Sequence, residues 1–266
     1  MKEISSTQNS LIKELIQLKD KSRLRKKKGL FLIEGVRELS LALKGTYEIE
    51  KILFLPRIID VAKIESLFYG KNIPELITIT EEVYKKLAYR DTTEGIVAVG
   101  KSKSHDIDSL ELKSSNPLIL IGEGIEKPGN IGAILRTADA ANIDAVIISN
   151  PKADLYNPNV IRSSVGCIFT NKVVAGTNEE VISWLKSNKV NVYSAALTAS
   201  KPYHEVDFTG PTAIVVGTEA TGLTGEWLEA STQNIIIPME GEIDSMNVSV
   251  SAAIILFEAK RQRIQH

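Results

Sequence analysis

Five short, almost uninterrupted apolar stretches in the second half of the chain constrain its fold more than any other feature. From Pro117 onward they read PLILIGEG, DAVIIS, NVYSAAL, TAIVVGTE and NIIIPM, and helical segments separate them. Strands that are apolar on both faces are typical of a mostly parallel sheet with helices on either side. The sequence therefore predicts an α/β fold, and sheets of this kind bind ligands beyond the carboxyl ends of their strands.

The first hundred residues predict a second, smaller α/β module. The segments SLIKELIQL, VRELSLALKG and TEEVYKKLA have helical spacing, and GLFLIEG, IEKILFL and EGIVAVG read as strands. The next sixteen residues lose this periodicity and are rich in Ser, Lys and Asp. We therefore predict one domain over residues 1–100, a linker over 101–116 and a second domain over 117–266.

Composition excludes several classes of protein. The 266 residues include one cysteine and three scattered histidines, so we expect no internal disulfide and no metal site. No stretch of eighteen uncharged apolar residues occurs, and the amino terminus does not resemble a signal peptide. We expect a cytoplasmic protein with no membrane association, in which Cys167 is a small buried side chain.

Charge is balanced overall but concentrated locally. The net charge of −1 argues against a protein that coats nucleic acid by bulk positive charge. Between Lys19 and Lys28, however, seven lysines or arginines face one aspartate. Such a run fits a phosphate backbone and equally fits a solvated helix end.

Three longer stretches each run from an apolar strand into a glycine-bearing turn. They are LILIGEGIEKPGNIGAILRTADAA, IVVGTEATGLTGEWL and IIIPMEGEIDSMNVSVSAAIILFEAKRQR. None has the order of a P-loop or a nucleophile elbow, and the spacing of a dinucleotide fingerprint fails because Lys127 occupies its third glycine position. ATP hydrolysis, serine hydrolysis and dinucleotide binding are therefore disfavoured.

Two residues of the first stretch have two interpretations each. Asn130 either caps the helix or serves a ligand. Arg136 either pairs with Asp139 on the surface or lies on a face of small residues, Gly132, Ala133 and Ala140, that RNA approaches closely. A glycine inside a helix costs about 1 kcal/mol relative to alanine, which favours the second interpretation of Arg136.

Together the three stretches resemble the three motifs of the SpoU or TrmH-like family of SPOUT-class RNA ribose 2′-O-methyltransferases. PGNIGAILRTADA resembles the first motif, VVGTEATGLT the second and IPMEGEIDSMNVSVSAAIILFE the third, while FLIEGVRELSLAL and DTTEGIVAV resemble an L30e-like substrate-binding domain. GEGIEKP departs from the usual aspartate-containing turn, and EAT from a more acidic form of the second motif. The resemblance implies a trefoil knot, S-adenosylmethionine as cofactor, a homodimer and an RNA substrate.

The resemblance also assigns residues. It places the polar catalytic set on Asn130, Arg136, Glu219, Ser245 and Asn247, and the cofactor on Gly217, Thr218, Gly222, Ile237, Met239, Met246 and Val248. We expect RNA on Arg23, Arg25, Lys26, Lys27, Lys28, Arg37 and Arg162. In the family the arginine is a suggested proton acceptor; because a guanidinium stays protonated, we expect Arg136 to hold a phosphate and orient the ribose.

The sequence leaves the substrate open. The accessory domain favours ribosomal RNA, with transfer RNA as the alternative. A non-catalytic RNA-binding or ribosome-assembly protein of the same fold is the rival from another class, and the intact polar set argues against it.

Overall fold

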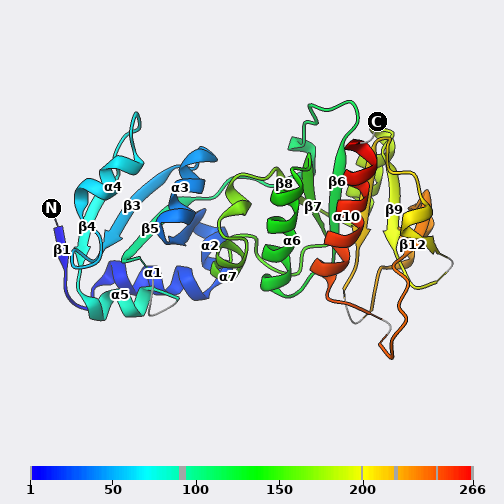
Figure 1. The fold of residues 1–266 in the computed structure, drawn as a ribbon. Helices are drawn as coiled ribbons and strands as arrows, with labels where there is room; N and C mark the ends of the chain where they lie inside the picture. The colour runs from blue at the N-terminus through cyan, green and yellow to red at the C-terminus, as the bar shows by residue number, and fades with distance from the viewer. Residues whose placement is uncertain (1, 90–93, 199, 219–220, 244, 265–266) are drawn as a thin grey trace. The chain divides into compact units, whose positions relative to one another are not determined.

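A computed structural model describes residues 2–89, 94–198, 200–218, 221–243 and 245–264, and the chain forms two compact units (Figure 1). The first unit comprises Met1–Ser104 and Asp154–Thr170, and the second comprises His105–Ala153 and Asn171–His266. The linker predicted over residues 101–116, between two functional domains, remains a prediction. The structure adds that the segment Asp154–Thr170 packs within the first unit.

The first unit contains a five-stranded mixed sheet in the order β1-β4-β3-β5-β2. Strands β1, β4 and β3 are parallel, whereas β5 runs antiparallel to both β3 and β2. Sequence patterns predicted β2, β3 and β5 and missed β1 and β4. Strand β1 has only three residues, and each of its partners in β4 lies 75 positions further along the chain. The strands are β1 (Lys2–Ile4), β2 (Leu30–Glu34), β3 (Ile49–Phe54), β4 (Glu75–Ile79) and β5 (Ile96–Lys101).

Helices cover this sheet. On α1, Asn9 accepts the amide N–H of Leu11 as N-cap, and Ile12, Leu15 and Leu18 form the buried stripe. That stripe shares one core with α5 and the sheet. The basic run between Lys19 and Lys28 contains a helix of its own, α2. The helices of the unit are α1 (Ser10–Asp20), α2 (Ser22–Lys28), α3 (Val36–Lys44), α4 (Val61–Leu67), α5 (Glu81–Leu87), α7 (Pro158–Ser163) and the 3₁₀ turn η2 (Cys167–Phe169).

Aromatic and ionic contacts explain why Asp154–Thr170 belongs to this unit. The rings of Phe31 and Tyr156 stack with centroids 4.2 Å apart. The guanidinium of Arg25 lies 2.6 Å from the carboxylate of Asp154, and the two side chains are only 4% and 9% exposed. Cys167 in η2 is buried, as predicted. The segment is therefore held by a buried core and a buried ion pair.

The second unit contains a seven-stranded sheet in the order β10-β12-β9-β11-β6-β7-β8. Every pair of neighbouring strands is parallel, so the predicted fold class is confirmed. Its strands are β6 (Leu118–Glu123), β7 (Ala145–Ser149), β8 (Val173–Gly176), β9 (Asn191–Ala195), β10 (Lys201–Pro202), β11 (Thr212–Val216) and β12 (Gln233–Ile236). The trefoil knot remains a prediction.

Helices cover both faces of this sheet. Helices α6 and α10 pack together on one face (Figure 1), while Val181 of α8 and Trp227 of α9 share a core with Ile119, Ile147 and Val215 on the other. The helices are α6 (Pro128–Ala141), α8 (Asn178–Ser187), α9 (Gly225–Ala230), α10 (Val248–Ile264) and the 3₁₀ turns η1 (Ile107–Ser109) and η3 (Tyr203–Glu205).

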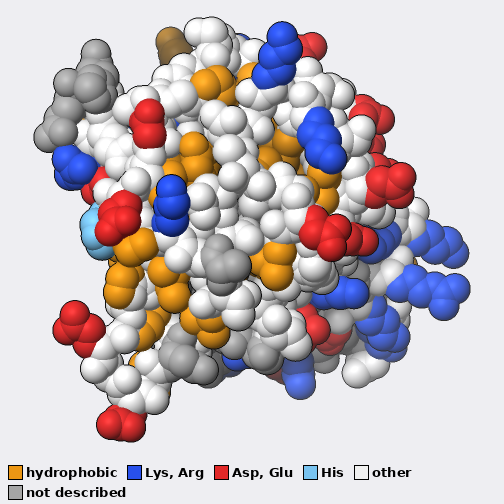
Figure 2. Space-filling model, turned by 90° about the vertical axis from the view of Figure 1, so that its right-hand side faces the viewer, with side chains coloured by type: hydrophobic (Ala, Val, Ile, Leu, Met, Phe, Trp, Pro, Cys, Tyr) orange, Lys and Arg blue, Asp and Glu red, His pale blue; other side chains and the backbone are white. Residues whose placement is uncertain are grey.

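Two further observations concern apolar residues. On the face shown in Figure 2, apolar side chains lie in several separate groups among polar ones. Within the described ranges, no helix is both long enough and apolar enough to cross a membrane.

Candidate active site

The carboxyl edge of the seven-stranded sheet brings the second and third motifs to the same side of the protein. Val215 of β11 pairs with Ser194 of β9, and Ile235 of β12 pairs with Ala195. Because these strands are parallel and in step, the chain leaves β11 and β12 at the same edge, on either side of β9. Gly217 and Ile237 therefore follow two strands of one edge.

The loop after β11 is packed backbone against backbone. A Cβ atom on Gly217 would lie 2.4 Å from both the carbonyl carbon and the carbonyl oxygen of Gly222. The amide of Gly222 donates to the carbonyl of Thr218 at 3.0 Å, and the hydroxyls of Thr218 and Thr221 are 2.7 Å apart. The loop is thus a tight turn with no room for a side chain at its first residue. Glu219, predicted to be catalytic, lies outside the described residues.

Helix α6 begins earlier than the sequence indicated. Lys127 is its N-cap residue and Pro128 stands at its first position, where the fixed φ of proline suits a helix. Asn130 is therefore in the first turn, and the interpretation of Asn130 as the cap is wrong.

The first and third motifs meet at two asparagines. The side-chain oxygen of Asn247 accepts the amide of Ser249 at 3.0 Å and its hydroxyl at 2.6 Å, so Asn247 caps α10. Its side-chain nitrogen donates to the side-chain oxygen of Asn130 at 3.2 Å. Two of the five predicted catalytic residues, 117 positions apart in sequence, are thus in direct contact.

Arg136 is exposed on α6. Among the described residues it forms no ion pair with Asp139, so the surface-pair interpretation finds no support. Gly132 is buried and Ala133 half-buried, whereas Asp139 and Ala140 are exposed. The expected open face therefore excludes Gly132, which is buried.

The other predicted residues differ in exposure. Arg136 lies six positions after Asn130, a rise of about 9 Å along the helix. Ser245 is exposed beside Asn247. In the predicted cofactor set, Val248 is buried, Gly222 is exposed, and the rest are half-buried: Gly217, Thr218, Ile237, Met239 and Met246.

A buried polar network behind the edge was not predicted. The amide of Asn178 donates to the carboxylate of Glu123 at 2.7 Å and accepts from the indole N–H of Trp227 at 2.9 Å. Glu123 also accepts the amide and hydroxyl of Thr224, at 2.9 Å and 2.7 Å. The network ties the end of β6 to the chain that follows the Gly217 turn. The sequence signal that could have indicated this network is Glu123, an acidic residue at the end of the apolar strand β6.

The predicted RNA-binding residues of the first unit fall into two groups. Arg23, Lys26, Lys27 and Arg37 are exposed, and Lys28 pairs with Glu14 at 2.5 Å. Arg25 differs because its guanidinium is buried against Asp154 and donates to the carbonyls of Leu18 and Lys19. Arg25 has a structural role and is not available to a phosphate, which corrects the prediction for this residue.

Comparison with known proteins identifies the family. A sequence model of the SpoU rRNA Methylase family matches residues 117–257, and a model of the MRM3-like substrate binding domain matches residues 9–98. The chain belongs to the SpoU rRNA methylase family. The resemblance drawn from the three motifs is confirmed, and together the family models span both halves of the chain.

Relatives of this family resemble the chain over nearly its whole length. The chain is 31% identical over 260 residues to 23S rRNA (guanosine(2553)-2′-O)-methyltransferase RlmP of Bacillus subtilis, covering 98% of this chain and 100% of that protein. A solved RNA 2′-O ribose methyltransferase is 38% identical with a TM-score of 0.86, covering 98% and 99% of the two chains. The SpoU methyltransferase AviRb from Streptomyces viridochromogenes, in complex with AdoMet, is 27% identical with a TM-score of 0.87, covering 97% and 99%.

Proposed function

We propose that this protein transfers a methyl group from S-adenosylmethionine to a ribose 2′-hydroxyl of ribosomal RNA in the cytoplasm. The observation that carries the proposal is the contact between Asn130 and Asn247, which joins the first and third family motifs beside the sheet edge. The relative from Bacillus subtilis, which this chain matches over 100% of that protein's length, is named as a 23S rRNA 2′-O-methyltransferase. This favours ribosomal RNA over transfer RNA as the substrate.

The residues at the edge fit the cofactor. The atoms nearest to a Cβ placed at Gly217 all belong to the backbone of Gly222 and Leu223, and a turn without side chains there lets amide and carbonyl groups approach a flat ligand. Half-buried Ile237, Met239 and Met246 offer apolar contact for an adenine ring and a thioether chain. Exposed Leu197, which follows β9 between the two loops, adds a further apolar contact that sequence reasoning did not include. When bound, S-adenosylmethionine supplies an electrophilic methyl group on its sulfonium.

Arg136 positions the RNA in this proposal. Its side chain is exposed, and a guanidinium matches a phosphate with two N–H donors. By holding the phosphate next to the target nucleotide, Arg136 would orient the ribose toward the bound cofactor. Asn130 and Asn247 hold the start of α6 against the start of α10, and Ser245 and Glu219 complete the polar set.

Exposed cations of the first unit select the RNA. Arg23, Lys26 and Lys27 have exposed side chains on α2, and Arg37 is exposed on α3. Each phosphate neutralised by such a group releases counterions, so affinity should fall steeply with added salt.

A homodimer is also part of the proposal. On α10, Val250, Phe257 and Ile264 are 47%, 49% and 80% exposed and stand seven residues apart, on one side of the helix. The opposite side, with Ile255 and Leu256, is already buried in the unit. A helix that is apolar on both sides is stable in water when a second surface covers it, and a second copy of the chain supplies that surface.

Methyl transfer with Arg136 variants tests the proposal. With saturating RNA we expect Arg136→Ala to lower the methylation rate roughly a hundredfold, the loss typical of a misplaced reactant, and Arg136→Lys to restore only a small part of it. Calorimetry should show unchanged binding of S-adenosylmethionine in both variants. Near-normal rates would contradict the role of Arg136, and wild-type protein that does not bind the cofactor would favour a non-catalytic RNA-binding protein.

The position of the methylated nucleotide is measured in cells. Mapping ribose methylations in total RNA with and without the gene should reveal one site lost from ribosomal RNA. A loss confined to transfer RNA would overturn the assignment of the substrate.

A further inference from the structure

A hollow of about 290 Å³ lies in the first unit, and none of its lining residues belongs to the predicted catalytic or cofactor sets. The turn between β2 and α3 forms one side, residues after α5 and before β5 form another, and α7 closes it. Small-molecule pockets begin at about 300 Å³, so the hollow has room for one planar group the size of a nucleobase.

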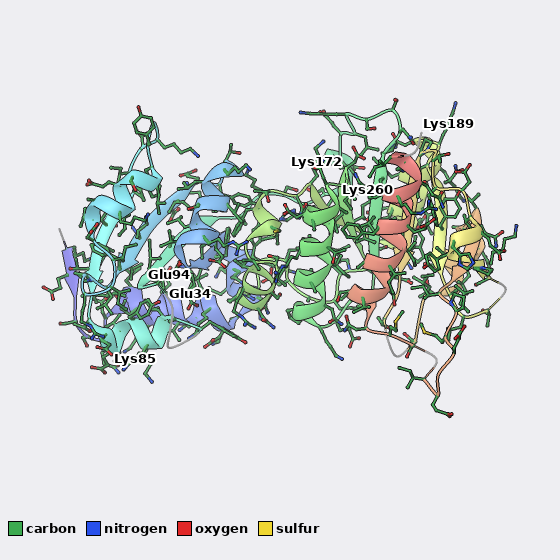
Figure 3. All side chains as sticks on the ribbon, in the orientation of Figure 1. Glu34, Lys85, Glu94, Lys172, Lys189 and Lys260 are labelled. Carbon is green, nitrogen blue, oxygen red and sulfur yellow. The ribbon has the colours of Figure 1, made fainter. Side chains whose placement is uncertain are left out.

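Three carboxylates gather in this hollow. Glu34 and Glu94, both labelled in Figure 3, line the hollow, as does Glu38 in the first turn of α3. The Glu34 carboxylate accepts the amide of Tyr89 at 2.6 Å, and the Glu94 carboxylate accepts the amide of Val36. Burial, with a further contribution from the Glu94 carboxylate, raises the pKa of Glu38. Lys19, Arg37 and Arg162 also line the hollow. A ligand that brings N–H donors to the carboxylates would stabilise their charged form.

Gly35 keeps the carboxylates close together. Its φ of +106° is a conformation that other residues rarely adopt. A Cβ atom at this position would lie 2.4 Å from a carboxylate oxygen of Glu38 and 3.5 Å from one of Glu94. The absence of a side chain therefore lets both carboxylates approach the same point of the backbone.

An aromatic ring and a guanidinium form another wall. The guanidinium carbon of Arg162 lies 5.1 Å from the centroid of Tyr89, whose side chain is 51% exposed. The Nε atom of Arg162 is buried and has no hydrogen-bond partner among the described residues. Tyrosine and arginine are the planar groups on which unpaired RNA bases stack. Hydrogen-bond acceptors beside a stacking wall fit a nucleobase.

We infer that this hollow binds an unpaired guanine of the RNA, with Glu38 and Glu94 accepting its N1–H and N2–H donors. Guanine is the base that presents two adjacent donors on its Watson–Crick edge, one for each of these two carboxylates. Adenine and cytosine place an acceptor beside their amino group, and uracil offers a single donor between two acceptors. The inference deepens the proposed function by naming what the substrate-binding unit recognises.

Equilibrium binding to short RNAs tests the inference on the full-length protein without cofactor. Labelled uridine oligomers carrying one central guanosine, adenosine, uridine or inosine are compared by fluorescence anisotropy. We expect the guanosine oligomer to bind about tenfold more tightly than the adenosine or uridine oligomers, as hydrogen bonds to charged groups allow. Inosine lacks the N2 amino group and should lose most of that difference. Equal affinities for all four oligomers would overturn the inference with no variant needed.

Isosteric variants localise the preference. Glu38→Gln and Glu94→Gln should each bring the guanosine oligomer close to the others, while Glu82→Gln, an exposed glutamate of α5 outside the hollow, should leave the preference intact. Tyr89→Ala should weaken all four oligomers several-fold, and Tyr89→Phe should restore them. A guanosine preference that persists in both Glu38→Gln and Glu94→Gln would place it elsewhere and refute the site.

Binding of S-adenosylmethionine, measured separately on each variant, distinguishes two failures. Loss of the guanosine preference with normal cofactor binding counts against this hollow alone. A wild-type protein that prefers guanosine and neither binds the cofactor nor methylates RNA counts against the proposed function.

Discussion

At Gly217 a single missing side chain decides the shape of the proposed cofactor loop. The backbone of Gly222 and Leu223 occupies the space that a Cβ atom at position 217 would need. Backbone atoms cannot move aside as a flexible side chain can, so any other residue here must open the turn. The φ of Gly217 is not in the left-handed region, so the requirement for glycine here is steric.

Substitution of Gly217 tests the loop at the residue scale. Gly217→Ala should abolish measurable binding of S-adenosylmethionine by calorimetry and lower the free energy of unfolding by about 1–3 kcal/mol, as overpacking does. Gly225→Ala is the matched control, because position 225 begins α9 and a Cβ atom there meets nothing within 4 Å. Normal cofactor binding by Gly217→Ala would show that this turn does not hold the cofactor.

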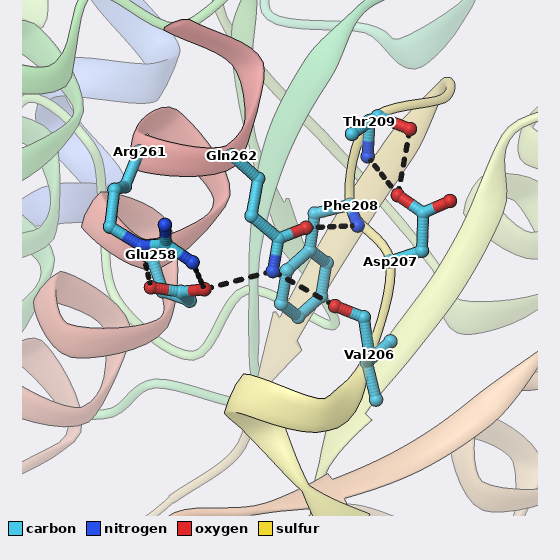
Figure 4. A network of polar contacts seen from close by, with 7 residues as sticks. All are labelled: Val206, Asp207, Phe208, Thr209, Glu258, Arg261 and Gln262. Atoms are coloured by element: carbon cyan, nitrogen blue, oxygen red, sulfur yellow. Dashed lines mark hydrogen bonds and ion pairs between the residues drawn. The ribbon is translucent and has the colours of Figure 1, made fainter. Parts of the chain in front are cut away.

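Among the elements, α10 is fixed at both of its ends. Its first turn is capped by Asn247. Near its last turn, Gln262 donates to the carbonyl of Val206 at 3.0 Å and accepts the amide of Phe208 at 2.8 Å (Figure 4). The guanidinium of Arg263 donates to the carbonyls of Phe208, Asn116, Pro117 and Gly210. The residues that precede β6 and β11 are thereby held against the carboxyl end of the helix.

Two neighbouring arginines of α10 give a matched comparison at the element scale. Arg263→Met leaves several half-buried carbonyls without their donor and should lower the free energy of unfolding by about 2 kcal/mol. Arg261→Met removes the ion pair with Glu258 (Figure 4), in which the arginine side chain is 55% exposed, and should cost less than about 1 kcal/mol. Denaturant unfolding of both variants measures the difference; equal losses would refute this role of Arg263.

At the scale of the whole molecule, the proposed dimer follows from the apolar stripe of α10. Three exposed apolar side chains at seven-residue spacing, Val250, Phe257 and Ile264, are costly for a monomer in water. Their regular spacing on one helix is what an interface between two copies requires.

Light scattering with size exclusion tests that interface. The wild-type chain should have twice the mass of one chain, and Phe257→Glu should bring it to the mass of a monomer because a buried charge disfavours association. Tyr69→Glu is the control, since Tyr69 is 95% exposed and belongs to the other unit. A wild-type monomer would exclude the dimer, and a Phe257→Glu dimer would show that another surface carries the contact.

The sequence by itself determined the kinds of element and the class of chemistry. Apolar stretches such as LILIGE and TAIVV become β6 and β11 of a parallel sheet because strand periodicity and burial are properties of a few neighbouring residues. The three motifs identified the family because each is a contiguous stretch. Helix starts were less certain: Asn247 is a cap and Asn130 is not, since Lys127 and Pro128 begin α6 one turn earlier.

Only the tertiary structure decided which distant residues meet. The contact between Asn130 and Asn247, the crowding of Gly217 and the network around Asn178 depend on how separate strands align at one edge. Arg25 looked like its basic neighbours in the sequence, yet Asp154, 129 residues away, neutralises it in a buried pair. Local sequence patterns reflect the secondary-structure propensity and burial of one segment. Contacts between distant residues arise from the packing of the whole chain, so only the tertiary structure shows which residues form the site.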